Sequence, residues 1–149
     1  MTQSRIPIVL YAVAAMLAMV GLAEATYLLV LYLTGETAVC GGSPDCFRVL
    51  GSVYARIGGI PVAAFGALAY FAVFSFAILA AFGHGYARRF LTFTVGTMFA
   101  VTLWLLFVQA FLLHAFCRYC MFSAALVFIL AALVTLAPPS RRKSNGETA

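Results

Sequence analysis

Charged residues are scarce in this sequence of 149 residues. Asp, Glu, Lys and Arg make up 9% of it, whereas a soluble domain carries about 25%. The mean hydropathy is +1.08 and 65% of the residues are hydrophobic, which excludes an ordinary soluble domain. Four apolar segments approach the length that crosses a bilayer: residues 6–33, 60–82, 90–113 and 117–137. We predict an all-α integral membrane protein built as a bundle of four transmembrane helices.

Acidic residues are scarcer still, four against nine basic residues, which leaves a net charge of +5. The placement of the basic residues explains this surplus without a nucleic-acid partner. Six flank the first segment, the second connection and the end of the fourth segment: Arg5, Arg88, Arg89, Arg141, Arg142 and Lys143. The other two connections hold three: Arg48, Arg56 and Arg118. Because basic residues gather on the cytoplasmic side of membrane proteins, we predict that both termini are cytoplasmic. We also predict a membrane domain over 1–137 and a polar, disordered tail over 138–149.

The first apolar segment has a second interpretation, a cleaved signal peptide. Arg5, the apolar stretch and Ala23-Glu24-Ala25 resemble such a peptide with its small-residue cleavage site. The apolar region of a signal peptide spans about 7–15 residues, whereas here it continues to Leu33. We therefore predict an uncleaved helix.

Glu24 is an acid inside that first helix. Intramembrane acids face the protein interior and often take part in function. The alternative is a neutral, hydrogen-bonded side chain packed between helices. The sequence leaves both interpretations open.

The sequence has four cysteines, which form two pairs, Cys40 with Cys46 and Cys117 with Cys120. The predicted topology places both pairs on the outer face, where disulfides persist. Cys117 and Cys120 open the fourth helix, and a helix N-terminus favours the reactive thiolate. His114, three residues earlier, either tunes Cys117 or bonds to the backbone. We interpret the CxxC as a redox-active pair.

The longest outer connection, residues 35–59, carries the other pair. Gly41 and Gly42 follow Cys40 and give the backbone freedom. Ser43-Pro44-Asp45 is a helix start signal, and apolar residues recur behind it at helical spacing as far as Ile57. We predict a short amphipathic helix on the membrane surface with Cys46 in its first turn.

A fixed pair and a mobile pair on one face of a membrane indicate an electron relay. Thiol–disulfide exchange moves two electrons through mixed disulfides, and a quinone is the lipid-soluble carrier that would accept them. One alternative is a non-enzymatic membrane scaffold braced by static disulfides. Another is a four-cysteine zinc site, although such sites use two short cysteine pairs and only one pair here is short enough.

Three features in a fixed order resemble the vitamin K epoxide reductase family. They are Cys46-Phe47-Arg48-Val49-Leu50-Gly51-Ser52, then Gly59-Ile60-Pro61-Val62, and then the late CxxC. The resemblance covers residues 6–137 and implies a four-helix bundle around a quinone, either menaquinone or ubiquinone. The other four-helix disulfide oxidase of bacterial membranes carries its CxxC in the first outer loop, an order that does not fit.

The resemblance also implies a role for each cysteine. Cys120 would lie nearest the quinone ring, and Cys117 would exchange with the loop. Cys40 and Cys46 would relay electrons from a thioredoxin-fold partner, and which of the two meets the partner stays open. Many bacterial relatives carry that partner as a fused domain with its own CxxC. Since no cysteine follows Cys120, we expect the partner to be a separate protein on the outer face.

Positions around the implied quinone site distinguish bacterial from animal members. Ser52 matches the family's serine beside the quinone, and Leu50 and Phe65 fall where the family has pocket-lining side chains. Animal members, which reduce vitamin K and its epoxide, have a tyrosine four residues after the last cysteine, where this sequence has Ala124. Their asparagine before the second helix has no clear equivalent near Gly58. We therefore expect a quinone-dependent thiol oxidase of the bacterial inner membrane, with an animal-type epoxide reductase as the alternative.

Overall fold

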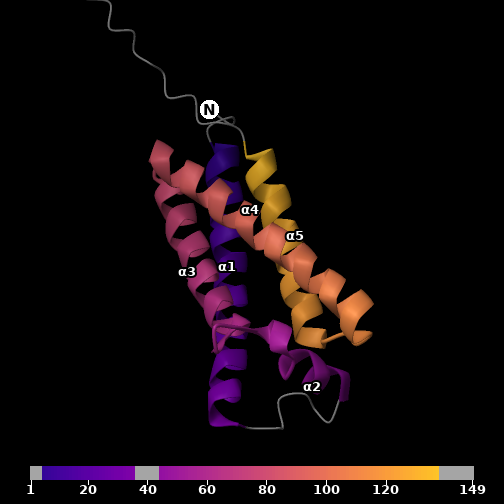
Figure 1. The fold of residues 1–149 in the computed structure, drawn as a ribbon. Helices are drawn as coiled ribbons and strands as arrows, with labels where there is room; N and C mark the ends of the chain where they lie inside the picture. The colour runs from indigo at the N-terminus through magenta and orange to yellow at the C-terminus, as the bar shows by residue number, and fades with distance from the viewer. Residues whose placement is uncertain (1–4, 36–43, 138–149) are drawn as a thin grey trace, which may run out of the picture.

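The computed structural model describes residues 5–35 and 44–137, and these form a bundle of long helices (Figure 1). The long helices are α1 (Arg5–Thr34), α3 (Val62–Ala81), α4 (Gly85–Phe107) and α5 (Arg118–Leu136). Counting the turn that prolongs α4, each is long and apolar enough to cross a membrane. The prediction of an integral membrane bundle with four spanning helices is confirmed. The predicted tail over 138–149 lies outside the described residues.

Small side chains let the helices approach one another closely. Alanines such as Ala18, Ala77 and Ala87 are fully buried in the core, and close backbone contact is what drives helix association in lipid. Gly21 of α1 is a specific case, because a Cβ there would overlap the ring of Tyr70 from α3. The helix α1 packs against α3 and α5, and α4 packs against the same two.

The two ends of the bundle differ in what they carry (Figure 1). The start of α1 and the end of α5 lie together at one end. The start of α5 and the short helix α2 (Pro44–Leu50) lie at the other. Cys46, Cys117 and Cys120 therefore share one end of the molecule.

The surface helix α2 is shorter than the sequence predicted. It begins where expected, and its first turn carries the buried Cys46. The predicted continuation to Ile57 is wrong: the hydroxyl of Ser52 donates a hydrogen bond back to the carbonyl oxygen of Val49 at 2.8 Å. Such a side-chain bond competes with the next helical turn, and a glycine, a poor helix former, follows the last helical residue.

A hairpin occupies the rest of this connection. After the single 3-10 turn η3 (Val53–Ala55), the strands β1 (Arg56–Ile57) and β2 (Ile60–Pro61) pair in antiparallel fashion. Gly58 and Gly59 join them with φ angles of 60° and 85°, and two-residue hairpin turns of this kind need positive φ at both positions. The glycine pair thus reverses the chain and delivers it directly into α3.

Candidate active site

The CxxC straddles the first residue of α5. Cys117 is the N-cap, with an extended backbone, and is fully buried, whereas Cys120 lies within the first turn. Both are free cysteines. A hydrogen bond from the Cys120 thiol, together with backbone N–H groups of Cys120 and Tyr119, lowers the pKa of Cys117 to about 6 although burial opposes the shift. Cys117 is therefore the thiolate of the pair at neutral pH, as expected for a helix start.

Gln109 fixes the position of Cys117. Its side-chain oxygen accepts a hydrogen bond from the backbone N–H of Cys117 at 3.1 Å, and its backbone carbonyl accepts one from Ala115 at 3.2 Å. Gln109 is only 3% exposed and belongs to the π-helical turn η4 (Val108–Leu113), after which His114 takes a left-handed conformation with φ 49°. π-helical turns often mark functional sites. The sequence alone indicates no role for Gln109, since an amide eight residues before a cysteine matches no known spacing.

Cys46 lies directly against Cys117. The two sulfur atoms are 3.8 Å apart and are enclosed with Val49 and Ala115 in one buried cluster. Cys46 is disulfide-bonded, and Cys40, its predicted partner, lies outside the described residues. A thiolate against a disulfide sulfur is the arrangement that exchange requires, because the reaction proceeds by thiolate attack on sulfur.

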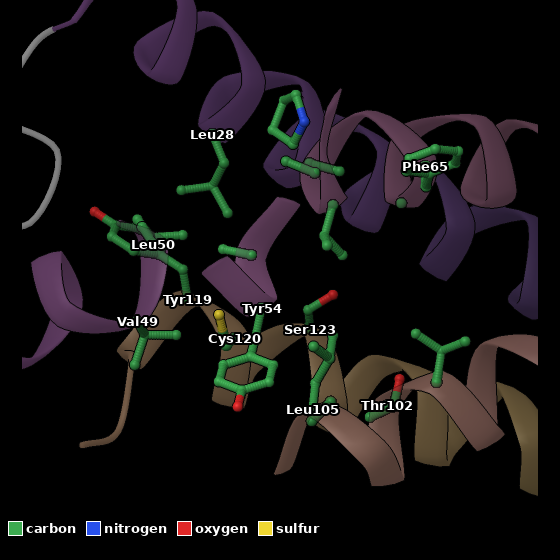
Figure 2. A pocket seen from close by; sticks show the side chains of 18 of the residues that line it. Leu28, Val49, Leu50, Tyr54, Phe65, Thr102, Leu105, Tyr119, Cys120 and Ser123 are labelled. Carbon is green, nitrogen blue, oxygen red and sulfur yellow. The ribbon is translucent and has the colours of Figure 1, made fainter. Parts of the chain in front are cut away.

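Cys120 instead lines a cavity of about 630 Å³ within the bundle. This volume falls within the range of about 300–1,000 Å³ that is typical of small-molecule sites. The walls include Ser52, Leu50 and Phe65, which the family resemblance placed at a binding pocket. Figure 2 shows the Cys120 sulfur pointing toward the space between Leu28, Leu50 and Phe65.

The cavity contains a small polar group of side chains from three helices. The hydroxyl of Tyr70 lies 2.8 Å from that of Ser123, so that a hydrogen bond ties α3 to α5. Ser123 follows Cys120 by three residues and shares its helix face, a spacing that the sequence analysis did not use. Nothing in the sequence distinguishes Tyr70 from the other aromatic residues of its segment. Glu24 also lines the cavity, and within 5–35 and 44–137 its two buried carboxyl oxygens have no hydrogen-bond partner.

Comparison with known proteins agrees with this arrangement. Among models of protein families, that of the vitamin K epoxide reductase family matches residues 12–135. A search of the curated proteins finds no match. The matched range contains both cysteine pairs and nearly all of the four spanning helices. The chain therefore belongs to the vitamin K epoxide reductase family and is a membrane thiol–disulfide oxidoreductase.

Proposed function

We propose that the protein oxidises a thioredoxin-fold partner and passes two electrons through two cysteine pairs to a membrane quinone. The observation that carries this proposal is the opposite placement of the two thiols of the CxxC. Cys117 lies 3.8 Å from the sulfur of Cys46, and Cys120 lines an apolar cavity of small-molecule size. One thiol is thus placed for sulfur exchange and the other for a substrate within the bilayer.

The thiol half of the proposed cycle uses the loop pair. A thiolate of the reduced partner attacks the Cys40–Cys46 disulfide, forms a mixed disulfide and frees one loop thiolate. The contact between Cys46 and Cys117 favours Cys40 as the cysteine that meets the partner and Cys46 as the one released. Cys46 then attacks Cys117 of the oxidised pair and frees Cys120. The second thiol of the partner and then Cys40 resolve the two mixed disulfides, which leaves the partner oxidised and the CxxC reduced.

The quinone half of the cycle takes place in the cavity. The reduced pair closes into the Cys117–Cys120 disulfide and gives up two electrons, and a quinone supplies the acceptor for them. The nearly uniform apolar lining suits a lipid-soluble ring, and Ser52 is among the lining residues that carry a hydroxyl group. Menaquinone and ubiquinone both fit this description.

We place the cysteine end of the bundle on the outer face of a bacterial inner membrane, with both termini in the cytoplasm. Six of the nine basic residues flank the other end of the spanning segments, as expected of a cytoplasmic side. The outer face is the oxidising side, where a disulfide relay has secreted proteins to oxidise.

The test is a redox titration of the purified protein. Dithiothreitol first reduces the cysteines, the reductant is removed, and menadione or a short-chain ubiquinone is added without oxygen. Free thiols are counted by alkylation and mass, and quinol is measured by absorbance. We expect thiols to disappear in pairs with one quinol formed for each pair. Thiols that persist beside quinone would contradict the proposal and favour static disulfides, and turnover of vitamin K epoxide would favour the animal-type reaction.

A further inference from the structure

One acid faces the cavity, and the cycle above does not use it. Glu24 lies on α1 about three helical turns from the outer end of that helix. Both carboxyl oxygens are buried, and the described residues offer them no hydrogen-bond partner. No Lys, Arg or His side chain of the described chain lines the cavity, so no cation there balances a carboxylate.

An acid in such surroundings is more stable with its proton than without it. Burial of an unpaired carboxylate in an apolar medium costs far more free energy than burial of the neutral acid. The packing interpretation of Glu24 requires hydrogen bonds that repay its burial, and none is present among the described residues. Glu24 is therefore a protonated acid at the wall of the cavity.

The titratable groups nearest Glu24 come from α3 and from the start of α5. Glu24 interacts electrostatically with Tyr70 on α3 and with Cys117 and Cys120 at the start of α5. The helix α4 adds no titratable side chain to the cavity wall. The remaining titratable groups of the wall are the phenols of Tyr32, Tyr54 and Tyr119. Among the groups of the cavity wall, Glu24 is the strongest acid by its ordinary chemistry.

The proposed reaction has a use for this proton. Reduction of a quinone to a quinol consumes two electrons and two protons. Cys117 enters the reaction as a thiolate, and Cys120 keeps its hydrogen as the donor to that thiolate. The reduced pair therefore brings two electrons but only one proton to the cavity.

We infer that Glu24 donates the second proton to the quinone oxygen, an inference that rests on the proposed function. As the sulfur–sulfur bond forms between Cys117 and Cys120, the Cys120 proton goes to one oxygen of the quinone and the Glu24 proton to the other. Glu24 is left as a carboxylate without a partner. It regains a proton from the water on the cysteine side, where ionisation of Cys117 had released one, so that protons and electrons balance over the cycle.

The test compares Glu24→Gln with wild type in a single turnover. The reduced protein is mixed with menadione, and quinol formation is followed from mildly acidic to mildly alkaline pH. We expect quinol formation to slow by about 100-fold, the usual contribution of a positioned general acid. The rate of both proteins rises as Cys117 ionises near pH 6. At higher pH the wild-type rate falls again as Glu24 loses its proton, and the variant lacks this fall. Reduction of the Cys117–Cys120 disulfide by a small dithiol stays at the wild-type rate, because no step there uses the acid.

Two further variants make the result specific. Glu24→Asp keeps an acid on a shorter side chain and should restore the fall at higher pH with part of the rate. Thr26→Val removes a polar group from the exposed face of the same helix, outside the cavity wall, and should leave the rate unchanged. An Asp variant without the fall at higher pH, or a Gln variant with the wild-type rate and profile, would overturn the inference while the proposed function stands. A wild-type protein that leaves menadione unreduced overturns both.

Discussion

Cys117 and Cys120 share one motif but belong to two regions that are built differently. Cys117 belongs to a region of short segments, where α2 and η4 meet and bury sulfur atoms from two parts of the chain against each other. Cys120 faces a cavity that the long helices enclose together with residues of α2 and η3. The first region holds reacting atoms in contact, and the second provides room for a molecule that enters from outside the chain.

The difference follows from the place of each cysteine at the start of α5. As the N-cap, Cys117 has a non-helical backbone, and the backbone N–H groups of Tyr119 and Cys120 in the first turn lower its pKa. Cys120, inside that turn, shares a helix face with Ser123 and projects into the cavity. A spacing of two residues across a helix start is thus enough to place one thiol against the sulfur of Cys46 and the other at the cavity.

The largest expected effect comes from removing either thiol. Cys120→Ala and Cys117→Ala should abolish quinone reduction, because neither variant can form the intramotif disulfide. Cys46→Ala should keep quinone reduction when a small dithiol supplies the electrons, since the dithiol reaches the CxxC without the loop pair. The rates are measured as quinol formed with dithiothreitol as donor. Equal activity of all three variants would remove the distinction between the two regions.

Cys120→Ala also tests the sulfur contact itself. With Cys120 absent, the Cys117 thiolate attacks the Cys46 sulfur of the Cys40–Cys46 disulfide and releases Cys40 as a thiol. Oxidised partner or a small disulfide captures the Cys40 thiol that would reverse this step, so a Cys46–Cys117 disulfide should accumulate in its presence. Peptide mass analysis under non-reducing conditions detects it. A Cys40–Cys117 disulfide instead would reverse the roles that the 3.8 Å contact assigns to the loop cysteines.

The pH dependence of Cys117 is the next comparison. Because hydrogen bonds lower its pKa to about 6, the thiolate and its reactivity should be present above that pH and should be lost as the pH falls through it. The ultraviolet absorbance of the thiolate gives the titration in a variant that lacks Cys40 and Cys46. Cys120→Ala in the same background should move the midpoint upward, since the donor of the strongest hydrogen bond is gone. An unchanged midpoint would show that the helix start alone sets the pKa.

Gln109→Ala should slow thiol exchange at Cys117 and leave the reaction at the cavity unchanged. It leaves the buried N–H of Cys117 without its acceptor. An unsatisfied buried donor lowers the free energy of unfolding by about 1–3 kcal/mol. We expect thiol exchange with Cys46 to slow by roughly tenfold, because misplaced reacting atoms lose part of their orientation. The rate is measured in a Cys120→Ala background, as the appearance of the Cys46–Cys117 disulfide in samples quenched by alkylation at successive times. The matched control is Thr102→Val on α4, which changes a cavity side chain but no contact of Cys117.

The two regions also differ in how far sequence could predict them. The spanning helices follow from hydropathy, because length and apolar character are what a bilayer selects. The prediction that the surface helix continues to Ile57 was wrong, because helical spacing is weaker evidence than a glycine pair that closes a hairpin. The contact of Cys46 with Cys117 joins residues 71 positions apart, and no local pattern specifies it. The role of Gln109 depends on a π-helical turn that has no sequence signature.

The smallest expected effect concerns the tie between α3 and α5. Tyr70→Phe removes the hydroxyl that bonds to Ser123 at 2.8 Å and keeps the ring that fills the space beside Gly21. The free energy of unfolding should fall by about 1 kcal/mol, the usual value of one hydrogen bond, while the rate of thiol exchange stays at the wild-type level. Thermal unfolding in detergent measures the first quantity and dithiol mixing the second. A slower exchange in this variant would mean that the packing of the cavity wall positions Cys117 as well, so that the two regions act as one unit.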